Sequence, residues 1–295
     1  MARAASSLLG IDWGTSNRRA YLVERGGKVL AQHQDGQGML AVGKDFAASL
    51  ASLRQQLSVP DDVPTVMSGM VGSASGWQEV AYLDVAVPVT ALPGNLSAVA
   101  GAQHCFIVPG YCKRHDGVDV MRGEETQLLG ALSLGAADGW MVLPGTHSKW
   151  VFLREGKIEQ LATYMTGELF AMLSQGGTLA SLMASGEDDE AAFLAGMDEA
   201  QAGKPLSTTL FGVRARVVSK AMPVTQARSF VSGLLIGTEF AAARQQAGTR
   251  IQLIGSAALS ARYDSAAAHF GMQATVRDPD AVYLAALQCF FESAA

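Results

Sequence analysis

The sequence IDWGTSN (residues 11–17) lies between two apolar segments, residues 7–12 and 17–24, that have the composition of β-strands. A Gly26-Gly27 pair then leads into a third segment of this kind at residues 28–33. Short glycine-containing turns between such segments are typical of β-hairpins. The chain is therefore predicted to begin with consecutive β-hairpins.

The same order of segments returns at residues 140–161. A strand is followed by the turn PGTHS (144–148), a second strand, a Glu155-Gly156 turn and a third strand. A pattern that repeats at long spacing indicates duplicated architecture. We therefore expect an α/β protein of two related domains, residues 1–136 and 137–295, that face each other.

Composition excludes several classes of protein. The net charge of -5 and the lack of any run of five Lys or Arg residues argue against a general affinity for nucleic acid. No segment approaches the roughly 18 consecutive apolar residues that a membrane helix needs. The 3 Cys residues form no CxxC pair and have no zinc-finger spacing, which favours a reducing, cytoplasmic location.

The residues of the first turn suit a phosphate group. Asp12 ends a strand, Gly14 lets a ligand approach the backbone, and three side chains that can donate hydrogen bonds follow: Thr15, Ser16 and Asn17. Backbone N–H groups in such a turn form an anion-binding site. Because Asp12 would repel a phosphate, a bridging divalent cation is implied, and we expect Asp12 to hold Mg²⁺. An ordinary hairpin turn is the alternative.

The second turn repeats this chemistry. Gly145, Thr146 and His147 could hold phosphate groups in the same way, and Lys149 adds a positive charge. Two phosphate-binding turns on two domains predict a nucleotide site. The pair Gly255-Ser256 ends a predicted buried strand, where an adenine or ribose could lie against the backbone; a plain strand-to-helix turn is the alternative.

The segment RGEETQ (122–127) adds charged groups. Glu124 and Glu125 begin a predicted helix and are candidates to accept a proton from a substrate hydroxyl during phosphoryl transfer. Acidic residues also cap helices, which is the alternative role. Arg122 and Arg19 are candidates to bind a carboxylate-bearing substrate through their N–H groups, and a solvated surface position is the alternative for both.

These motifs, in this order, resemble those of the sugar-kinase/Hsp70/actin superfamily. IDWGTSNRR (11–19) is similar to its first phosphate loop, LPGTHSKW (143–150) to its second, and LIGSAAL (253–259) to its adenosine motif. From about residue 8 to about residue 292 the chain resembles one family, the 2-dehydro-3-deoxygalactonokinases. Four further segments carry that resemblance: SGMVGSASGWQEVAYLDVAVP (68–88), VMRGEETQLLGA (120–131), MTGELF (165–170) and FVSGLLIGTE (230–239).

The resemblance implies two ribonuclease-H-like (actin-like ATPase) domains with mixed five-stranded sheets. It implies transfer of the γ-phosphate of ATP to the 6-hydroxyl of 2-dehydro-3-deoxy-D-galactonate, in D-galactonate breakdown. The expected partners are ATP, Mg²⁺ and the sugar acid, without nucleic acid or membrane, and a homodimer is an open option. The sugar acid is expected near four residues: Met70, Gly72, Ser73 and Trp77.

The identity of the catalytic base stays open. Relatives in the wider carbohydrate-kinase group have an Asp in a GDQ-type helix start where this chain has GEE (123–125). Glu124 is preferred because it follows Gly123 directly, and Glu125 and Asp12 are its rivals. Two other functions remain alternatives: a phosphohydrolase or ATPase of the same fold, and a non-catalytic sugar-acid sensor.

Overall fold

The computed structural model describes residues 6–184, 186, 188–243 and 248–294. The chain divides into two compact units. Unit 1 comprises Met1–Gly139, Val151–Leu161 and Asp278–Ala295, and unit 2 comprises Trp140–Trp150 and Ala162–Arg277. The chain therefore passes from one unit to the other after residues 139, 150, 161 and 277. The assignment of separate functions to residues 1–136 and 137–295 stays a prediction.

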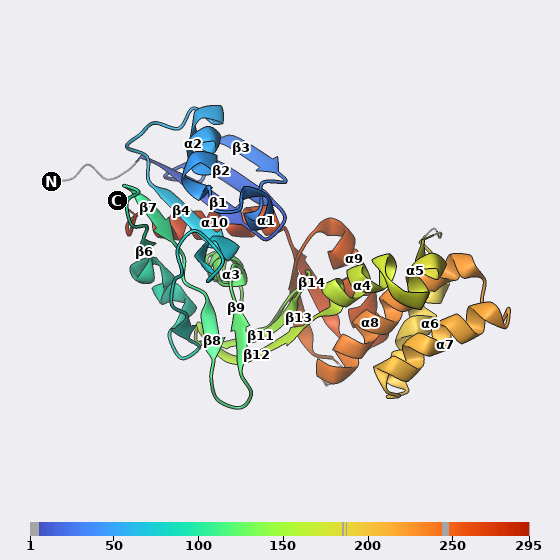
Figure 1. Ribbon diagram of the computed structural model, residues 1–295. Helices are drawn as coiled ribbons and strands as arrows, with labels where there is room; N and C mark the ends of the chain where they lie inside the picture. Colours follow the sequence, from blue (N-terminus) through green and yellow to red (C-terminus); the bar gives the residue numbers. More distant parts are fainter. Residues whose placement is uncertain (1–5, 185, 187, 244–247, 295) are drawn as a thin grey trace. The chain divides into compact units, whose positions relative to one another are not determined.

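A six-stranded sheet forms the centre of unit 1 (Figure 1). Its strands are β1 Ser7–Trp13, β2 Arg18–Glu24, β3 Val29–Asp35, β4 Thr65–Gly69, β6 Ser97–Ala98 and β7 Cys105–Ile107. They lie in the order β3-β2-β1-β4-β7-β6. β2 is antiparallel to β1, whereas β4 is parallel to β1 and β7 to β4. The predicted hairpins are confirmed, and the two-residue β6 is one strand more than the five expected.

A three-stranded sheet of unit 1 is built from β5 (Leu83–Asp84), β8 (Tyr111–Lys113) and β9 (Asp119–Met121). After β5 the chain continues into the 3-10 helix η2 (Val89–Asn95). Pro88 precedes this helix and Pro93 lies within it, and neither has the N–H group that a longer strand would donate.

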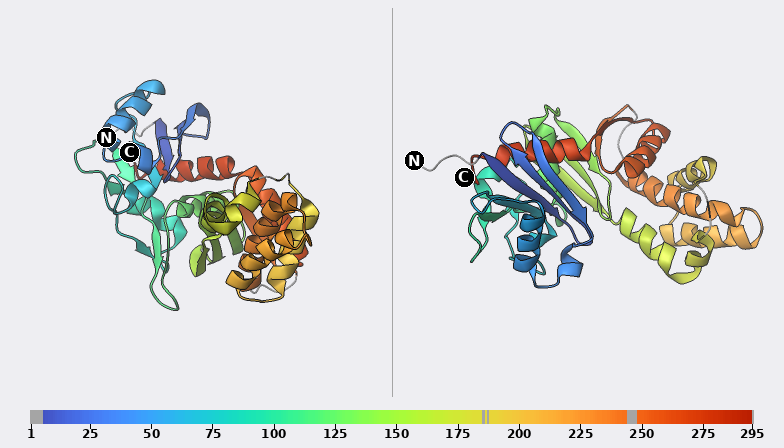
Figure 2. Two further views of the ribbon diagram at one scale, coloured as in Figure 1. Left: turned by 45° about the vertical axis from the view of Figure 1, so that its right-hand side comes forward. Right: turned by 90° about the horizontal axis from the view of Figure 1, so that it is seen from above.

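Successive residues of β1 face opposite sides of the sheet. Leu9, Ile11 and Trp13 are buried in one hydrophobic cluster with α2 (Phe46–Gln56). Gly10 faces α10 (Pro279–Phe290), since a Cβ at Gly10 would lie 2.3 Å from the Leu287 side chain. The two helices lie on opposite faces of the sheet in Figure 2. Because Asp12 shares the face of Gly10, it points toward the α10 side.

A further helix of unit 1 packs against α10. α3 (Glu124–Ser133) packs against α10 so closely that a Cβ on Gly130 would lie 1.8 Å from the Val282 carbonyl oxygen. α10 begins at Pro279 because the Asp278 side chain caps it, accepting from Asp280 N at 2.8 Å, and Pro279 is favoured in a first turn. The short helices are α1 Met39–Val42 and η1 Met70–Gly72.

The second large sheet has five strands: β10 Gly139–Leu143, β11 Ser148–Arg154, β12 Lys157–Tyr164, β13 Arg250–Ile254 and β14 Gln273–Arg277. They lie in the order β12-β11-β10-β13-β14, and β13 is parallel to both β10 and β14. In chain order this is third, second, first, fourth, fifth, which is also the order of β3-β2-β1-β4-β7. The repeated strand order confirms the duplicated α/β fold that the sequence predicted.

Unit 2 is mostly helical outside this sheet. Its helices are α4 Thr166–Gln175, α5 Gly177–Met183, α6 Glu190–Gln201, α7 Leu206–Val218, η3 Val224–Gln226, α8 Ala227–Ala243 and α9 Ala257–His269. α8 packs tightly on α6, since a Cβ on Gly233 would lie 1.9 Å from the Phe193 carbonyl oxygen. Within the described part of the chain, no helix has both the length and the apolar character to cross a membrane.

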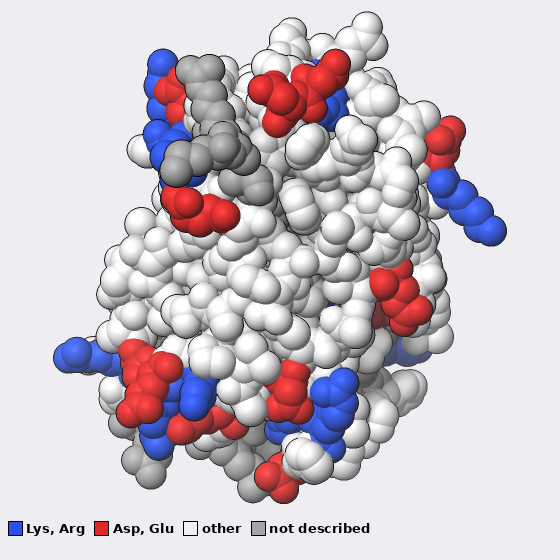
Figure 3. Space-filling view, turned by 90° about the vertical axis from the view of Figure 1, so that its left-hand side faces the viewer, with Lys and Arg blue, Asp and Glu red and all other residues white. Residues whose placement is uncertain are grey.

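Charged side chains of both signs lie next to one another on the surface in Figure 3. Lys and Arg residues on this face do not gather into a separate basic patch. The mixed charge agrees with the small net charge of the chain.

Candidate functional site

The first predicted phosphate turn, residues 14–17, follows β1 directly. Its backbone closes on itself, since Gly14 N donates to Asn17 O at 2.9 Å. The N–H groups of Met39 and Leu40 also donate to carbonyl groups of the turn. Its three polar side chains are exposed: Thr15, Ser16 and Asn17. A well-anchored turn with exposed donors therefore stands at the end of β1.

Asp12 forms an ion pair beside this turn. Its Oδ2 atom lies 2.8 Å from Arg19 Nη2, and Arg19 Nη1 lies 3.5 Å from Asp280 Oδ1. Burial lowers the pKa of Arg19, but the neighbouring carboxylates, Asp12 foremost, raise it above its usual value. Arg19, a candidate for binding the substrate carboxylate, thus already neutralises one side of Asp12.

Two glycines keep side chains away from the other side of Asp12. A Cβ on Gly69 would lie 3.5 Å from Asp12 Oδ1 and 2.8 Å from Trp13 O. A Cβ on Gly123 would lie 3.3 Å from Gly69 Cα. Their φ angles are +92° and +110°, in the region that favours glycine. The start of α3 therefore lies next to the end of β1, and no sequence motif indicated that these two glycines would meet.

The two acidic residues at the start of α3 have different surroundings. Glu125 is 0% exposed, and both of its carboxylate oxygens accept from Gly123 N, at 2.7 and 2.8 Å. Glu124 is half-buried, and its Oε2 atom accepts from Arg122 N at 3.1 Å. Burial, followed by the charge of Glu124, raises the pKa of Glu125 to about 8. Of the two, Glu124 has the carboxylate that solvent and small molecules can approach.

We expect the free energy of unfolding to decrease with rising pH because of Glu125. Its pKa is raised on folding, so the stabilisation is present below about pH 4.5 and is lost as the pH rises through about 8. Each pKa unit corresponds to about 1.4 kcal/mol, so the loss amounts to roughly a few kcal/mol. Thermal melts of the wild type and E125Q across this pH range measure it. The melting temperature of E125Q should depend less on pH than that of the wild type. Equal pH dependence of the two melting temperatures would contradict the expectation.

Arg122 is held by local contacts but retains two unsatisfied donors. Its Nη2 atom donates to Val80 O at 2.7 Å, and its guanidinium lies 4.1 Å from the centre of the Tyr82 ring. A Cβ on Gly72 would lie 2.8 Å from Arg122 Nη1, so a side chain at position 72 would displace the guanidinium from its present position. Nε and Nη1 are buried and have no hydrogen-bond partner among the described residues. Unsatisfied buried donors are rare, and an anion would satisfy these two.

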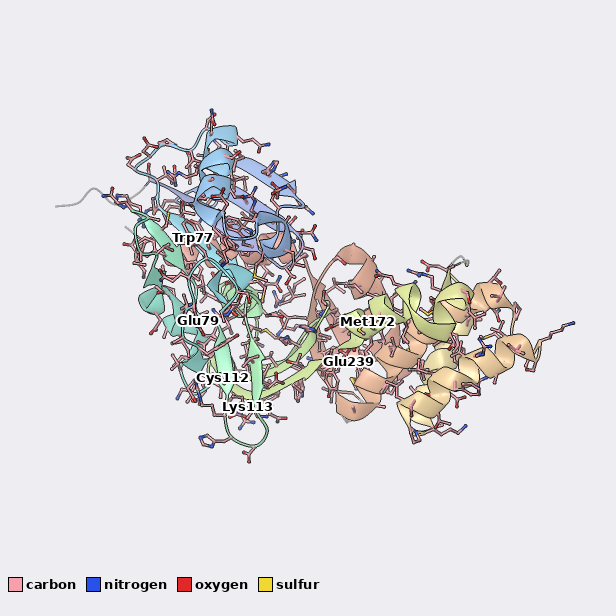
Figure 4. The ribbon with its side chains drawn as sticks, in the orientation of Figure 1. Trp77, Glu79, Cys112, Lys113, Met172 and Glu239 are labelled. Carbon is pink, nitrogen blue, oxygen red and sulfur yellow. The ribbon has the colours of Figure 1, made fainter. Side chains whose placement is uncertain are left out.

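The other residues expected near the sugar acid lie in or after η1. Met70 is half-buried, and Ser73 Oγ donates to Met39 Sδ at 3.6 Å. The Trp77 ring stacks on Phe46, with 6.2 Å between ring centres and 10° between the planes. Trp77 (labelled in Figure 4) therefore packs against the core of unit 1, and its contact with a substrate stays a prediction.

The second predicted phosphate turn joins β10 to β11 in unit 2. The start of α4 holds it, because a Cβ on Gly167 would lie 2.3 Å from Gly145 O and Glu168 N donates to a carbonyl of the turn at 2.9 Å. His147 Nε2 lies 2.5 Å from Glu168 Oε2, and both side chains are exposed. Lys149 is 4% exposed at the beginning of β11. A carboxylate thus orients the exposed His147 of the turn.

The predicted adenosine residues lie beside this turn. A Cβ on Gly255 would lie 3.3 Å from Pro144 Cδ. The Ser256 hydroxyl caps α9 by accepting from Leu259 N at 3.5 Å. Gly255 therefore lies next to the residue that precedes the second turn, and the contact of Gly255 and Ser256 with an adenosine stays a prediction.

A cavity of about 230 Å³ opens in unit 2 next to these loops. Gly145 borders it from the second turn, and its walls come from α4, α8 and α9, with Thr166, Ile236 and Tyr263 among the lining residues. A largely apolar cavity with a few polar groups is typical of a small-molecule site. The sequence did not predict this lining, because its residues come from distant segments that only tertiary packing brings together.

The chain is similar along most of its length to one group of proteins. The family model for 2-keto-3-deoxy-galactonokinase matches residues 12–289. A 2-dehydro-3-deoxygalactonokinase of Escherichia coli (strain K12) is 36% identical over 284 residues, which cover 95% of this chain and 96% of the relative. A probable 2-dehydro-3-deoxygalactonokinase of Rhizobium meliloti (strain 1021) is 34% identical over 289 residues, which cover 94% of each protein.

A solved structure shows the same similarity. The crystal structure of a candidate 2-dehydro-3-deoxygalactonokinase from Sinorhizobium meliloti matches with a TM-score of 0.89 at 33% sequence identity. The match covers 95% of this chain and 94% of that chain. The resemblance inferred from the sequence motifs is confirmed.

Proposed function

Because the chain belongs to the 2-keto-3-deoxy-galactonokinase family, we propose that it transfers the γ-phosphate of ATP to the 6-hydroxyl of 2-dehydro-3-deoxy-D-galactonate. The reaction is a step of D-galactonate breakdown. The observation that carries the proposal is the family match over residues 12–289, which spans both turns, the start of α3 and the cavity of unit 2. The substrate in this proposal is inferred from the names of the two relatives.

In this proposal the two turns bind the phosphate groups of ATP. Backbone N–H groups and small polar side chains in such turns favour anions. The proposed phosphate contacts are Gly14, Thr15, Ser16 and Asn17 from the first turn, and Gly145, Thr146 and His147 from the second. Lys149, which is buried in β11, would add a positive charge behind the second turn. The cavity of unit 2, with Gly255 and Ser256 nearby, would take the adenosine group. The anchoring of both turns supports this role, since a fixed turn loses little freedom on binding.

Asp12 fits a hydrated divalent cation. Arg19 occupies its Oδ2 atom, whereas Oδ1 faces the space that Gly69 and Gly123 leave free of side chains. No cluster of three or more His, Cys, Asp or Glu residues with metal-binding geometry occurs in the ranges that the structure describes. Mg²⁺ at Asp12 would therefore take its other ligands from water and from phosphate oxygens, as it usually does with nucleotides. When bound, it would neutralise phosphate charge.

Glu124 is our proposed proton acceptor for the 6-hydroxyl. It is half-buried at the start of α3, and Gly123 brings that helix start close to the residues around Asp12. Glu125 is enclosed and engages Gly123 N with both oxygens, so its proposed role is to hold the backbone at the start of α3. Asp12 stays the rival base.

A coupled assay for ADP tests the proposed function. ADP should form with 2-dehydro-3-deoxy-D-galactonate and far more slowly with a neutral hexose, and the rate with the gluconate epimer measures how strictly the C4 configuration is read. Release of ADP or phosphate without any sugar acid would indicate a phosphohydrolase instead. Binding of the sugar acid without turnover would indicate a sensor. A cytoplasmic location is also proposed, because Cys105, Cys112 and Cys289 are all free thiols.

We expect R122M to raise the KM for the sugar acid by a factor of roughly 10 to 100, since a hydrogen bond to a charged group contributes about 1.5–3 kcal/mol. The two unsatisfied donors of Arg122 are the proposed partners of the substrate carboxylate, so the KM for ATP should not change. Steady-state kinetics with each substrate varied in turn measure both values. R114M is the control, because Arg114 is 52% exposed and pairs with Asp84. An unchanged KM for the sugar acid in R122M would remove Arg122 from the substrate site.

A further inference from the structure

Glu239 is a buried carboxylate to which the proposed mechanism assigns no task. It lies on α8 (Figure 4) and is 1% exposed. Its Oε1 atom accepts from Ser148 Oγ at 2.6 Å and Trp150 Nε1 at 2.7 Å. Its Oε2 atom accepts from Thr166 Oγ1 at 2.5 Å and Tyr263 OH at 2.7 Å. Four donors from three other elements thus meet on one side chain.

The four donors occupy all the acceptor positions of the Glu239 carboxylate. A carboxylate has two oxygens with about four acceptor positions, and four donors occupy them. Burial raises the pKa of Glu239 above its usual value, against the opposing effect of these donors. A buried charge contributes less to stability than apolar packing of the same volume often would. Through these four hydrogen bonds Glu239 links β11, α4 and α9.

The donors belong to the surroundings of the cavity in unit 2. Thr166 and Tyr263 line the cavity, and Ser148 ends the turn that starts at Gly145. Thr166 also begins α4, and the next residue, Gly167, lies against Gly145 O. Glu239 itself does not appear in the cavity lining and can act on a ligand only through these neighbours.

We propose that Glu239 is a positioning residue for the nucleotide: it fixes the second turn, the start of α4 and the Tyr263 hydroxyl in the arrangement that binds ATP. The inference rests on the proposed function, in which ATP occupies this cavity. The residue would therefore act on nucleotide affinity and leave the binding of the sugar acid alone.

E239Q tests the proposal with little change of volume. Trp150 can only donate, so the amide oxygen of the introduced glutamine must face Trp150 and Ser148. The amide NH₂ group then faces Thr166 and Tyr263, whose hydroxyls must rotate to accept. Titration calorimetry with a non-hydrolysable ATP analogue should show at least a tenfold weaker Kd for E239Q. The KM for the sugar acid should stay at the wild-type value.

Two threonine variants distinguish a loss of nucleotide affinity caused by a displaced donor from one caused by lower stability of the fold. T166V removes one donor to Glu239, whereas T209V removes a buried hydroxyl that donates to Leu206 O within α7. Both residues lie in the first turn of helices of unit 2 and are nearly fully buried, at 8% and 4% exposure. T166V should weaken analogue binding several-fold, and T209V should not, even where their melting temperatures fall equally.

Two results would overturn the inference. One is wild-type affinity for the analogue in both E239Q and T166V. The other is a loss of affinity that follows the melting temperature in all three variants, including T209V. If the wild type bound no ATP analogue, the proposed function itself would be wrong. That result is distinguishable from failure of the Glu239 inference, because it is obtained with the wild type alone.

Discussion

D12N lowers kcat by a factor of about 10³ in our expectation, because it removes the charge that would hold Mg²⁺ beside the transferred phosphoryl group. The introduced asparagine would keep the shape of the strand end and could still accept from Arg19. The melting temperature should therefore change little, since the Asp12–Arg19 pair is partly exposed and such pairs contribute little to stability. Initial rates at saturating ATP and sugar acid measure the effect.

D280N is the matched control for D12N. Asp280 is the other carboxylate near Arg19, at 3.5 Å, and it is 56% exposed. Its loss should change kcat by no more than about threefold, because its side chain is mostly exposed and exposed ion pairs contribute little. If D12N kept wild-type kcat, or if D280N were equally impaired, the assignment of Asp12 to the metal would be wrong.

E124Q is the second variant with a large expected effect. A general base contributes a factor of roughly 10² to 10⁴ to the rate, so kcat should fall within that range while both KM values stay close to the wild type. The reason lies at the start of α3, where Glu124 is the half-buried carboxylate and Glu125 is enclosed. Rapid-quench measurement of the phosphoryl-transfer step would separate this loss from product release.

E125Q discriminates between the two glutamates. The introduced glutamine can still accept from Gly123 N with its amide oxygen, so the start of α3 should be retained. We expect a loss in kcat of less than about tenfold from the altered backbone position. A larger loss in E125Q than in E124Q would make Glu125 the base. Near-normal kcat in both variants would leave Asp12 as the remaining candidate.

The turn after β1 and the start of α10 were predictable because the residues that determine them are neighbours in the sequence. Gly14 and the polar residues after it specify a tight turn, and Asp278-Pro279 specifies the start of a helix. Both signals act within a few residues, and the structure has the turn and α10 at those positions. The repeat of the hairpin pattern likewise predicted the second sheet and its strand order.

α7 shows where such rules fail. Thr208, Thr209, Gly212 and Val213 all have low helix propensity, so residues 206–218 give no helical signal from composition. The helix forms because Val213 is 0% exposed within a cluster made with other helices of unit 2. Tertiary packing overrides the local preference there.

Only those residues of the candidate site that belong to a local sequence motif could be predicted. Asp12, Gly145 and Gly255 carry signals in their own motifs. Glu239 carries none, because in the sequence it is one acidic residue in an apolar helix and its four donors come from distant segments. The positive φ of Gly123 and its approach to Gly69 are equally invisible before the fold is known.

The position of α10 has a consequence for how the protein is made. Ribosomes release the chain from its N-terminus, so β1 and α2 can associate early. The opposite face of β1, with Gly10 and Asp12, receives its covering helix only when residues 279–290 have emerged. Until then that face of the nascent sheet lacks its covering helix, so the surroundings of Asp12 are completed only after residues 279–290 are made.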